Sequence, residues 1–263
     1  SSFDDTAAAV IKAEGSRFGQ PRFSVLSNVS YSQVAIHEKF GGIVPNLASR
    51  AHLQKIGPTV KSSLLISDIN NEDVDLIAVT RGPGLMPSLL VGVNFARALA
   101  YKWQKPIIGV NHIEGHIYSN CLTAQNTSRN LMRQKKKIEF PALILIVSGG
   151  HTELVLMKRH GQYKIIGETL DDAAGECFDK TARILGLGFP GGPAIAKEAE
   201  KFQVSNSKFQ VKLPRPMINS KDYNFSFSGL KTAVLYLYNN LTAQNASRID
   251  VRSAMAYEIQ QAI

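Results

Sequence analysis

The chain has 263 residues, of which 44% are hydrophobic and 19% are charged; this excludes wholesale disorder and suffices for one large domain or two lobes. No apolar run approaches the roughly 20 residues that span a bilayer, which indicates a soluble protein, and Cys121 and Cys177 are too few for a disulfide framework. The net charge of +9 favours an anionic partner, with nucleic acid as the first candidate, although many basic proteins, mitochondrial ones among them, have the same balance.

The first half of the sequence predicts strands that alternate with helices. The ranges 7–11 and 23–29 are typical of paired strands on either side of a polar turn, and 74–79 is typical of a short buried strand. A helix is predicted from about Pro87, because apolar residues recur there at spacings of three and four, and a further strand at 106–110. This alternation predicts a mixed or parallel sheet covered by helices.

The second half opens in the same way as the first. A strand at 142–147 leads through a tight turn, Ser148-Gly149-Gly150, to strands at 153–157 and 163–166. A polar turn that carries a threonine also precedes the first strand of the chain, at Asp4-Asp5-Thr6. We interpret the two strand–turn–strand openings as a weak internal duplication.

Two such lobes are the plan of the actin/hexokinase class, in which both hairpin turns point at nucleotide phosphates. We therefore predict an α/β, two-lobed actin/hexokinase-like fold with mixed sheets and helices on both faces, divided into residues 1–110 and 111–263. The polar start and an end inside a predicted helix lead us to expect a chain cut short at both ends, and no targeting peptide is visible. Residues 127–137, with five basic and no acidic side chains, indicate a surface insertion that is either solvated or in contact with phosphate.

A histidine pair is the strongest local signal for chemistry. His112 and His116 follow a predicted strand at a spacing of four, so on a helix both imidazoles lie on one face and can reach one metal ion. The zinc-protease motif is excluded, because it requires Glu directly after the first His and this chain has Ile113 there. Seen alone, such a pair is as often a structural accident as a metal site.

Glycines mark two candidate anion sites. In the Ser148-Gly149-Gly150 turn, backbone N–H groups can approach an anion without a Cβ in the way, although a plain hairpin turn looks similar. Further along, an apolar stripe over 174–185 predicts a helix whose outer side carries Asp179, and Gly191-Gly192-Pro193 opens the next helix. Such an arrangement can hold a ribose and a phosphate, or can be an ordinary solvated face.

The segment 225–232 resembles a further turn, and its Lys231 is predicted to be available to an anion.

Together these segments resemble the tRNA adenosine threonylcarbamoyltransferases, once described as O-sialoglycoprotein endopeptidases. The matches run in the expected order from residue 4 to about 232. The opening Ser2-Phe3-Asp4-Asp5-Thr6 is closer to the bacterial and mitochondrial branch, in which Cys is usual at the position of Phe3. The matching motifs are Gly41-Gly42-Ile43-Val44-Pro45, Ala48-Ser49-Arg50-Ala51-His52, Gly82-Pro83-Gly84-Leu85, a run from Arg97 through Trp103, Pro106, His112, Gly115, His116 and Ile117, Ser148-Gly149-Gly150-His151-Thr152, Gly175-Glu176-Cys177-Phe178-Asp179-Lys180, Gly188-Phe189-Pro190-Gly191-Gly192-Pro193 and Phe225-Ser226-Phe227-Ser228-Gly229-Leu230-Lys231-Thr232.

The resemblance implies an acyltransferase that modifies tRNA. The exocyclic amine of the adenosine just 3′ of the anticodon, in tRNAs reading ANN codons, would attack the carbamoyl carbon of threonylcarbamoyl-AMP, and AMP would leave. One divalent metal ion, zinc or iron, would be the cofactor. The implied partners are tRNA and threonylcarbamoyl-AMP, with no membrane, and a homodimer is the implied assembly. Basic charge and the branch favour a mitochondrial location, with the bacterial cytoplasm as the alternative.

The resemblance also assigns roles to individual residues. His112 and His116 would hold the metal, Asp179 would bind the ribose, and Gly192 would line the nucleotide. Asp4 would be a catalytic or positioning carboxylate. The adenylate would be cradled by Ile146, Val147, Ser148, Gly149 and Gly150.

The family also draws functional residues from a later segment. A third metal ligand, an Asp, and an Asn that contacts the nucleotide come from beyond the position matched by Ile263. Two other functions stay open from the residues alone: a phosphotransferase of the same fold, and a non-catalytic scaffold subunit.

Overall fold

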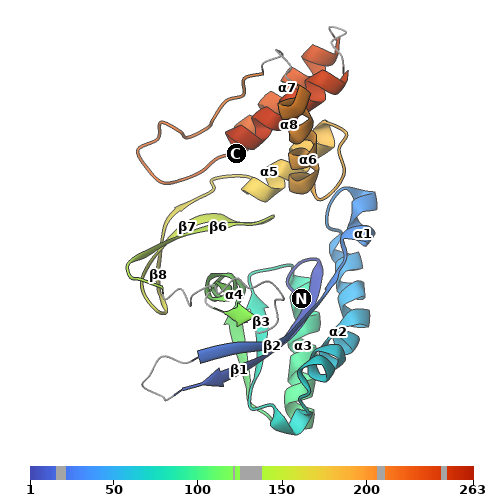
Figure 1. Ribbon diagram of the computed structural model, residues 1–263, viewed down its shortest axis with the longest axis vertical. Coiled ribbons are helices and arrows are strands. Elements are labelled where there is room, and N and C mark those ends of the chain that lie inside the picture. Colours follow the sequence, from blue (N-terminus) through green and yellow to red (C-terminus); the bar gives the residue numbers. More distant parts are fainter. Residues whose placement is uncertain (16–21, 121, 125–137, 206–210, 244–247) are drawn as a thin grey trace. The chain divides into compact units, whose positions relative to one another are not determined.

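The computed structural model describes residues 1–15, 22–120, 122–124, 138–205, 211–243 and 248–263 (Figure 1). The chain divides into two compact units. The first comprises 1–36 and 43–138, and the second comprises 37–42 and 139–263. Thr127–Lys137, interpreted above as an insertion, and Cys121 lie outside the described residues.

The first unit opens with a long hairpin. Strands β1 (Asp5–Glu14) and β2 (Arg22–Ser32) pair antiparallel, with Asp5 opposite Ser32 and a bulge at Val10/Ile11. The short β5 (Thr123–Ala124) adds to β2 in parallel. The predicted strands at 7–11 and 23–29 are confirmed, and both extend further than their apolar cores.

Helices cover this hairpin and a second sheet. Helix α2 (Pro45–Ser67) packs on β1 and β2, and it also contacts α3 (Met86–Trp103). Both helices begin with a proline in the first turn, where no N–H partner is needed. Helix α3 connects the parallel strands β3 (Ile77–Gly82) and β4 (Ile107–Asn111). The short helices α1 (Val34–His37) and η1 (Glu38–Phe40) precede α2.

The strand predicted at 74–79 begins later and is less buried than expected. Residues Asn71–Asp73 form a 3-10 turn, η2, closed by a capping box between Asn70 and Asp73, and Val74 ends this turn. Within β3 only Ile77 is buried, in a small cluster with Ala96 and Ala100. The apolar residues correctly predicted a strand, but the capping box of Asn70 and Asp73 delays its start.

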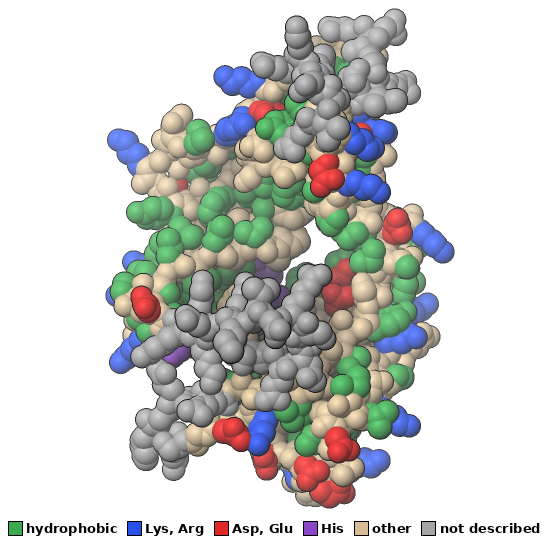
Figure 2. Space-filling view, in the orientation of Figure 1, with side chains coloured by type: hydrophobic (Ala, Val, Ile, Leu, Met, Phe, Trp, Pro, Cys, Tyr) green, Lys and Arg blue, Asp and Glu red, His purple; other side chains and the backbone are tan. Residues whose placement is uncertain are grey.

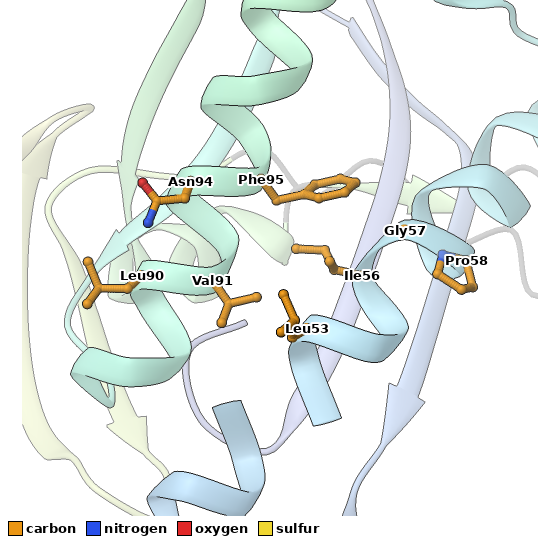
Figure 3. Close-up of a pocket in the computed structure, with 8 residues that line it drawn as sticks. All are labelled: Leu53, Ile56, Gly57, Pro58, Leu90, Val91, Asn94 and Phe95. Carbon is orange, nitrogen blue, oxygen red and sulfur yellow. The ribbon is translucent and has the colours of Figure 1, made fainter. Parts of the chain in front are cut away.

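An apolar groove lies between α2 and α3. In Figure 3, Leu53 and Ile56 of α2 and Val91 and Phe95 of α3 extend toward one another. The hollow that they line has a volume of about 400 Å³. Leu53 is 70% exposed, so this face of the unit offers apolar surface to solvent.

The second unit joins a meander to a helical cluster. Strands β6 (Ala142–Val147), β7 (Thr152–Arg159) and β8 (Gln162–Glu168) pair antiparallel in chain order. Helices α5 (Ala174–Ile184), α6 (Gly191–Ser205), α7 (Ser228–Ala243) and α8 (Arg248–Ala262) follow. Their shared core contains Cys177, Leu185, Ile195, Leu230, Val234, Val251, Met255 and Ile259.

The mixed α/β class is confirmed, but the two units differ from the lobes expected at 1–110 and 111–263. Helix α4 (His112–Ser119) directly continues β4 and contacts β3, so it groups with the first unit. Residues 37–42, in turn, group with the second unit, where the Arg183 guanidinium donates a hydrogen bond to the carbonyl oxygen of Gly41. Among the described residues, no helix combines the length and the apolar character needed to cross a membrane.

Candidate functional site

The structure brings the two predicted metal ligands together at the start of α4. Asn111 ends β4 and caps the helix, accepting hydrogen bonds from the backbone N–H groups of Ile113 at 2.8 Å and Glu114 at 3.3 Å. One turn apart, His112 and His116 place their Nε2 atoms 3.1 Å from each other, with ring centroids 4.4 Å apart. The helix predicted to carry this pair is confirmed.

The geometry of the pair fits a divalent metal ion. With metal–nitrogen distances of about 2.0–2.1 Å, a 3.1 Å separation gives an N–metal–N angle of about 100°, within reach of tetrahedral and octahedral coordination. Imidazole is a ligand that suits both zinc and iron. No group of three or more His, Cys, Asp and Glu suited to one ion occurs in the part of the chain that the structure describes. Two imidazole nitrogens thus lie close enough together to bind one ion.

The loop before β1 lines one side of the pair. The Ser2 hydroxyl lies 3.5 Å from His112 Nε2, and the Phe3 ring lies 6.1 Å from the His112 ring between centroids. Asp4 follows in the same loop, half-buried, and its carbonyl oxygen accepts a hydrogen bond from the Gln33 backbone N–H at 3.1 Å. Asp4 therefore belongs to the segment that approaches the histidine pair.

A buried histidine, to which no role was predicted from the sequence, holds this loop. His52 lies in α2 with no exposed surface; its Nε2 is 2.9 Å from the carbonyl oxygen of Phe3, and its Nδ1 is 2.7 Å from the Thr6 hydroxyl. Burial lowers the pKa of His52 below its ordinary value. The motif Ala48 to His52 was visible in the sequence, but the contact to Phe3 depends on tertiary structure.

The predicted glycine turn forms between β6 and β7. The Ser148 hydroxyl accepts hydrogen bonds from the N–H groups of Gly150 at 3.3 Å and His151 at 3.0 Å, so this side chain closes its own turn. Ile146 is buried and anchors the strand, whereas Val147, Gly149 and Gly150 are exposed. No atom lies within 4 Å of the position of a Cβ on Gly149, so one side of the turn is open to a ligand.

Helix α5 starts directly against this turn. The Gly175 N–H donates to the Ser148 carbonyl oxygen at 3.1 Å, and the Ala174 N–H donates to the Thr152 hydroxyl at 2.9 Å. The predicted apolar stripe of α5 is confirmed for Cys177, which is fully buried. Packing of α5 thereby fixes the backbone of the glycine turn.

Asp179 and Gly192, the predicted nucleotide contacts, lie close together in the second unit. The Asp179 Oδ1 accepts a 2.7 Å hydrogen bond from the Gly191 N–H at the first residue of α6. Gly192 has open space at its Cβ position. Asp179, but not Gly192, lines a small hollow of about 90 Å³, together with Glu38, Gly41, Arg183, Leu187, Gly188 and Phe189. Asp179 therefore accepts a hydrogen bond at the start of α6 and also lines a cavity.

The prediction for Lys231 is wrong. Its ammonium group pairs with the Asp172 carboxylate at 2.9 Å, and Lys180 pairs with the same carboxylate at 2.8 Å. Burial raises the pKa of Asp172, but the hydrogen bonds and charges of the two lysines outweigh burial and lower it overall. Lys231 of α7 is therefore ion-paired to the segment just before α5 and is not the free ammonium group that was expected.

The family model and the individual relatives that match this chain carry the same description. A family model described as tRNA N6-adenosine threonylcarbamoyltransferase matches residues 24–263. Proteins bearing that name match from Thermomicrobium roseum (50% identity over 94% of this chain and 63% of the relative). Others come from Thermosipho africanus (44% identity, 96% and 69%) and Bacillus subtilis (47% identity, 91% and 62%). The chain thus spans about two thirds of the length of these relatives.

Among solved structures, YeaZ from Pseudomonas aeruginosa matches with a TM-score of 0.32 and 16% identity, over 61% of this chain and 59% of that one. This similarity is too low for a conclusion about the fold.

Proposed function

The chain belongs to the tRNA N6-adenosine threonylcarbamoyltransferase family, and from this premise we propose that the whole protein transfers a threonylcarbamoyl group from threonylcarbamoyl-AMP to tRNA. The acceptor is N6 of the adenosine just 3′ of the anticodon. The observation that carries the proposal is the histidine pair, whose Nε2 atoms lie 3.1 Å apart in a chain that matches the family over residues 24–263.

His112 and His116 hold one divalent metal ion, zinc or iron. When bound, such an ion polarises or positions the acyl donor as a Lewis acid. The chain's own contribution is to keep both imidazoles on one helix turn, with the ring of His112 flanked by Ser2 and Phe3. Asp4, in the same segment, is a positioning carboxylate for the reacting groups.

The second unit binds the adenylate. Backbone N–H groups at the turn from Ile146 to Gly150 are oriented by Ser148 and by the start of α5, and Gly149 leaves room for a phosphate. Asp179 binds the ribose, and Gly192 lines the nucleotide beside it. In this proposal the two units correspond to the lobes of an actin/hexokinase-like fold.

tRNA is the macromolecular partner, which agrees with the net charge of +9. Lys and Arg side chains are scattered over the face shown in Figure 2 and, among its coloured residues, form no single patch. The mitochondrial location expected from the charge and the branch has no support from the relatives, because all three are bacterial. We therefore propose the alternative, a bacterial protein.

A homodimer is the assembly that the resemblance implies, and we propose it here. Light scattering after chromatography should give twice the chain mass for the full-length protein; the mass of a single chain would refute the homodimer.

Reconstitution tests the transferase function. Full-length protein, threonylcarbamoyl-AMP and an unmodified tRNA reading ANN codons should yield the modified adenosine, detected by mass spectrometry of nucleosides. His112→Ala with His116→Ala should abolish the product while circular dichroism shows a folded chain. Absence of product with the metal-loaded wild-type protein would refute the proposal, and transfer of a labelled γ-phosphate from ATP would identify a phosphotransferase instead.

A further inference from the structure

The strongest unassigned feature is a buried polar network around His52. Uncharged polar groups removed from water are destabilising unless they are hydrogen-bonded, and here each ring nitrogen has a partner. His52, Thr6 and Gln33 are all buried. Such a network fixes the relative positions of the segments that it joins, which are α2, the start of β1 and the loop before it.

The partners define which nitrogen of His52 carries the proton. The carbonyl oxygen of Phe3 can only accept, so the Nε2–H donates to it at 2.9 Å. In the neutral ring Nδ1 is then an acceptor, and it takes hydrogen bonds from the Thr6 hydroxyl at 2.7 Å and from Gln33 Nε2 at 3.3 Å. Gln33 Nε2 also faces the Ala48 carbonyl oxygen at 3.4 Å, which agrees with its role as a donor.

Two further hydrogen bonds hold residues 2 and 3 in place. The Ser88 hydroxyl donates to the same carbonyl oxygen at 3.3 Å, and the Leu85 N–H donates to the Ser2 carbonyl oxygen at 2.8 Å. The side chains of these two pinned residues face His112, with Ser2 Oγ 3.5 Å from its Nε2 and the Phe3 ring 6.1 Å away between centroids. His52 is thereby connected to the metal-binding pair through one short, restrained segment.

We propose that His52 is a positioning residue for the His112/His116 pair, acting through its hydrogen bond to the Phe3 carbonyl. This inference rests on the proposed function for the identity of the pair as a metal site. Groups that hydrogen-bond a metal ligand change metal affinity by about 10–100-fold. His52 acts one step further away, through the Phe3 backbone, so we expect loss of this bond to weaken metal binding by about tenfold, the lower end of that range.

Two substitutions at His52 separate the two hydrogen bonds. Gln places its amide nitrogen near the position of Nε2 and can still donate to Phe3, whereas Asn reaches only the position of Nδ1 and can bond Thr6 alone. We would measure zinc affinity of the full-length, metal-free protein by competition with a chromophoric chelator, with thermal unfolding by circular dichroism in parallel. His52→Asn should bind zinc about tenfold more weakly, and His52→Gln should stay within about threefold of wild type.

Matched serines control for a general loss of stability. Ser88→Ala removes the second donor to Phe3 and should weaken zinc binding about threefold. Ser63→Ala removes a buried 2.7 Å bond to Ser27, away from the loop, and should leave zinc affinity unchanged even if it lowers the melting temperature. If His52→Asn does not fold, the Ser88 and Ser63 variants alone decide the outcome.

Equal zinc affinity in His52→Gln and His52→Asn would overturn the positioning role; where His52→Asn does not fold, equal affinity in Ser88→Ala and Ser63→Ala would overturn it. If wild-type protein binds zinc through the pair and these variants do not differ, only this inference fails. If zinc binding depends on His52 as expected but no modified adenosine forms in the reconstitution, the proposed function fails and the positioning role stands.

Discussion

Gly175 lies in direct contact with Ser148, and its N–H donates a 3.1 Å hydrogen bond to the Ser148 carbonyl oxygen. A Cβ on Gly175 would come within 2.5 Å of that oxygen and within 2.8 Å of the Gly149 backbone. The first turn of α5 and the glycine turn after β6 therefore fit together only because residue 175 has no side chain.

Gly175→Ala should destabilise the second unit. The neighbouring atoms are backbone, which cannot rotate away, so we expect a loss of about 1–3 kcal/mol in the free energy of unfolding. Urea unfolding monitored by circular dichroism would measure it. An unchanged unfolding midpoint would show that α5 and the turn can separate without cost, contrary to the packing described.

Gly149→Ala should leave the stability nearly unchanged but weaken the binding of AMP. Its Cβ would meet no atom within 4 Å, so stability should change by less than about 1 kcal/mol. The methyl group would, however, occupy the open side where the adenylate is proposed to approach, and AMP affinity measured by calorimetry should fall at least about tenfold, or about 1.4 kcal/mol. Wild-type AMP affinity in this variant would remove the turn from the proposed nucleotide site.

These two glycines show what the sequence could and could not predict. The turn at Ser148 to Gly150 follows from local residue types, as does the placement of His112 and His116 on one helix face. The role of Gly175 depends on contact with a segment far along the chain, and no local pattern encodes it. The same reason explains why His52 had no role and why Lys231 was wrongly predicted to be available, since its partner Asp172 comes from another segment.

Asp171 holds the start of α7 from outside the helix. Its Oδ1 accepts hydrogen bonds from the N–H groups of Phe227 at 2.7 Å and Ser228 at 3.2 Å, and Ser226 donates to Oδ2 at 2.6 Å. Asp171→Ala leaves these donors at the helix start without the carboxylate and should cost about 0.5–2 kcal/mol. Asp171→Asn keeps an acceptor oxygen and should lose about half as much in the same urea experiment; equal losses would assign the effect to charge.

Cys177 should be unreactive in the folded protein. Burial raises the pKa of its thiol to about 12, and the nearby Asp172 carboxylate adds to this effect, so almost no thiolate exists near neutral pH. Iodoacetamide at pH 8 should leave the Cys177 peptide unmodified in native protein and alkylate it fully in urea, as read by mass spectrometry. Rapid alkylation under native conditions would show that the core around α5 opens.

His52 should also give the protein a specific dependence of stability on pH. Burial is the largest cause that lowers its folded pKa below 6.5, opposed by the Phe3 hydrogen bond and by Asp4 and Asp5. The unfolded state then binds more protons between the folded pKa and 6.5, so this contribution is complete above pH 6.5 and is lost as the pH falls below it. The slope contributed by one such group is at most about 1.4 kcal/mol per pH unit.

The matched variant His52→Gln isolates this effect, because it has no ionisable group at that position. Urea unfolding between pH 7.5 and 5 should show a steeper loss for wild type than for His52→Gln, starting near pH 6.5. Asp172 and Glu198 have lowered pKa values, so their contributions are lost only as the pH falls below the ordinary carboxyl range, and they affect both proteins alike. Parallel stability curves for the two proteins over this window would mean that folding does not disfavour the charged form of His52, contrary to the lowered pKa that burial gives it.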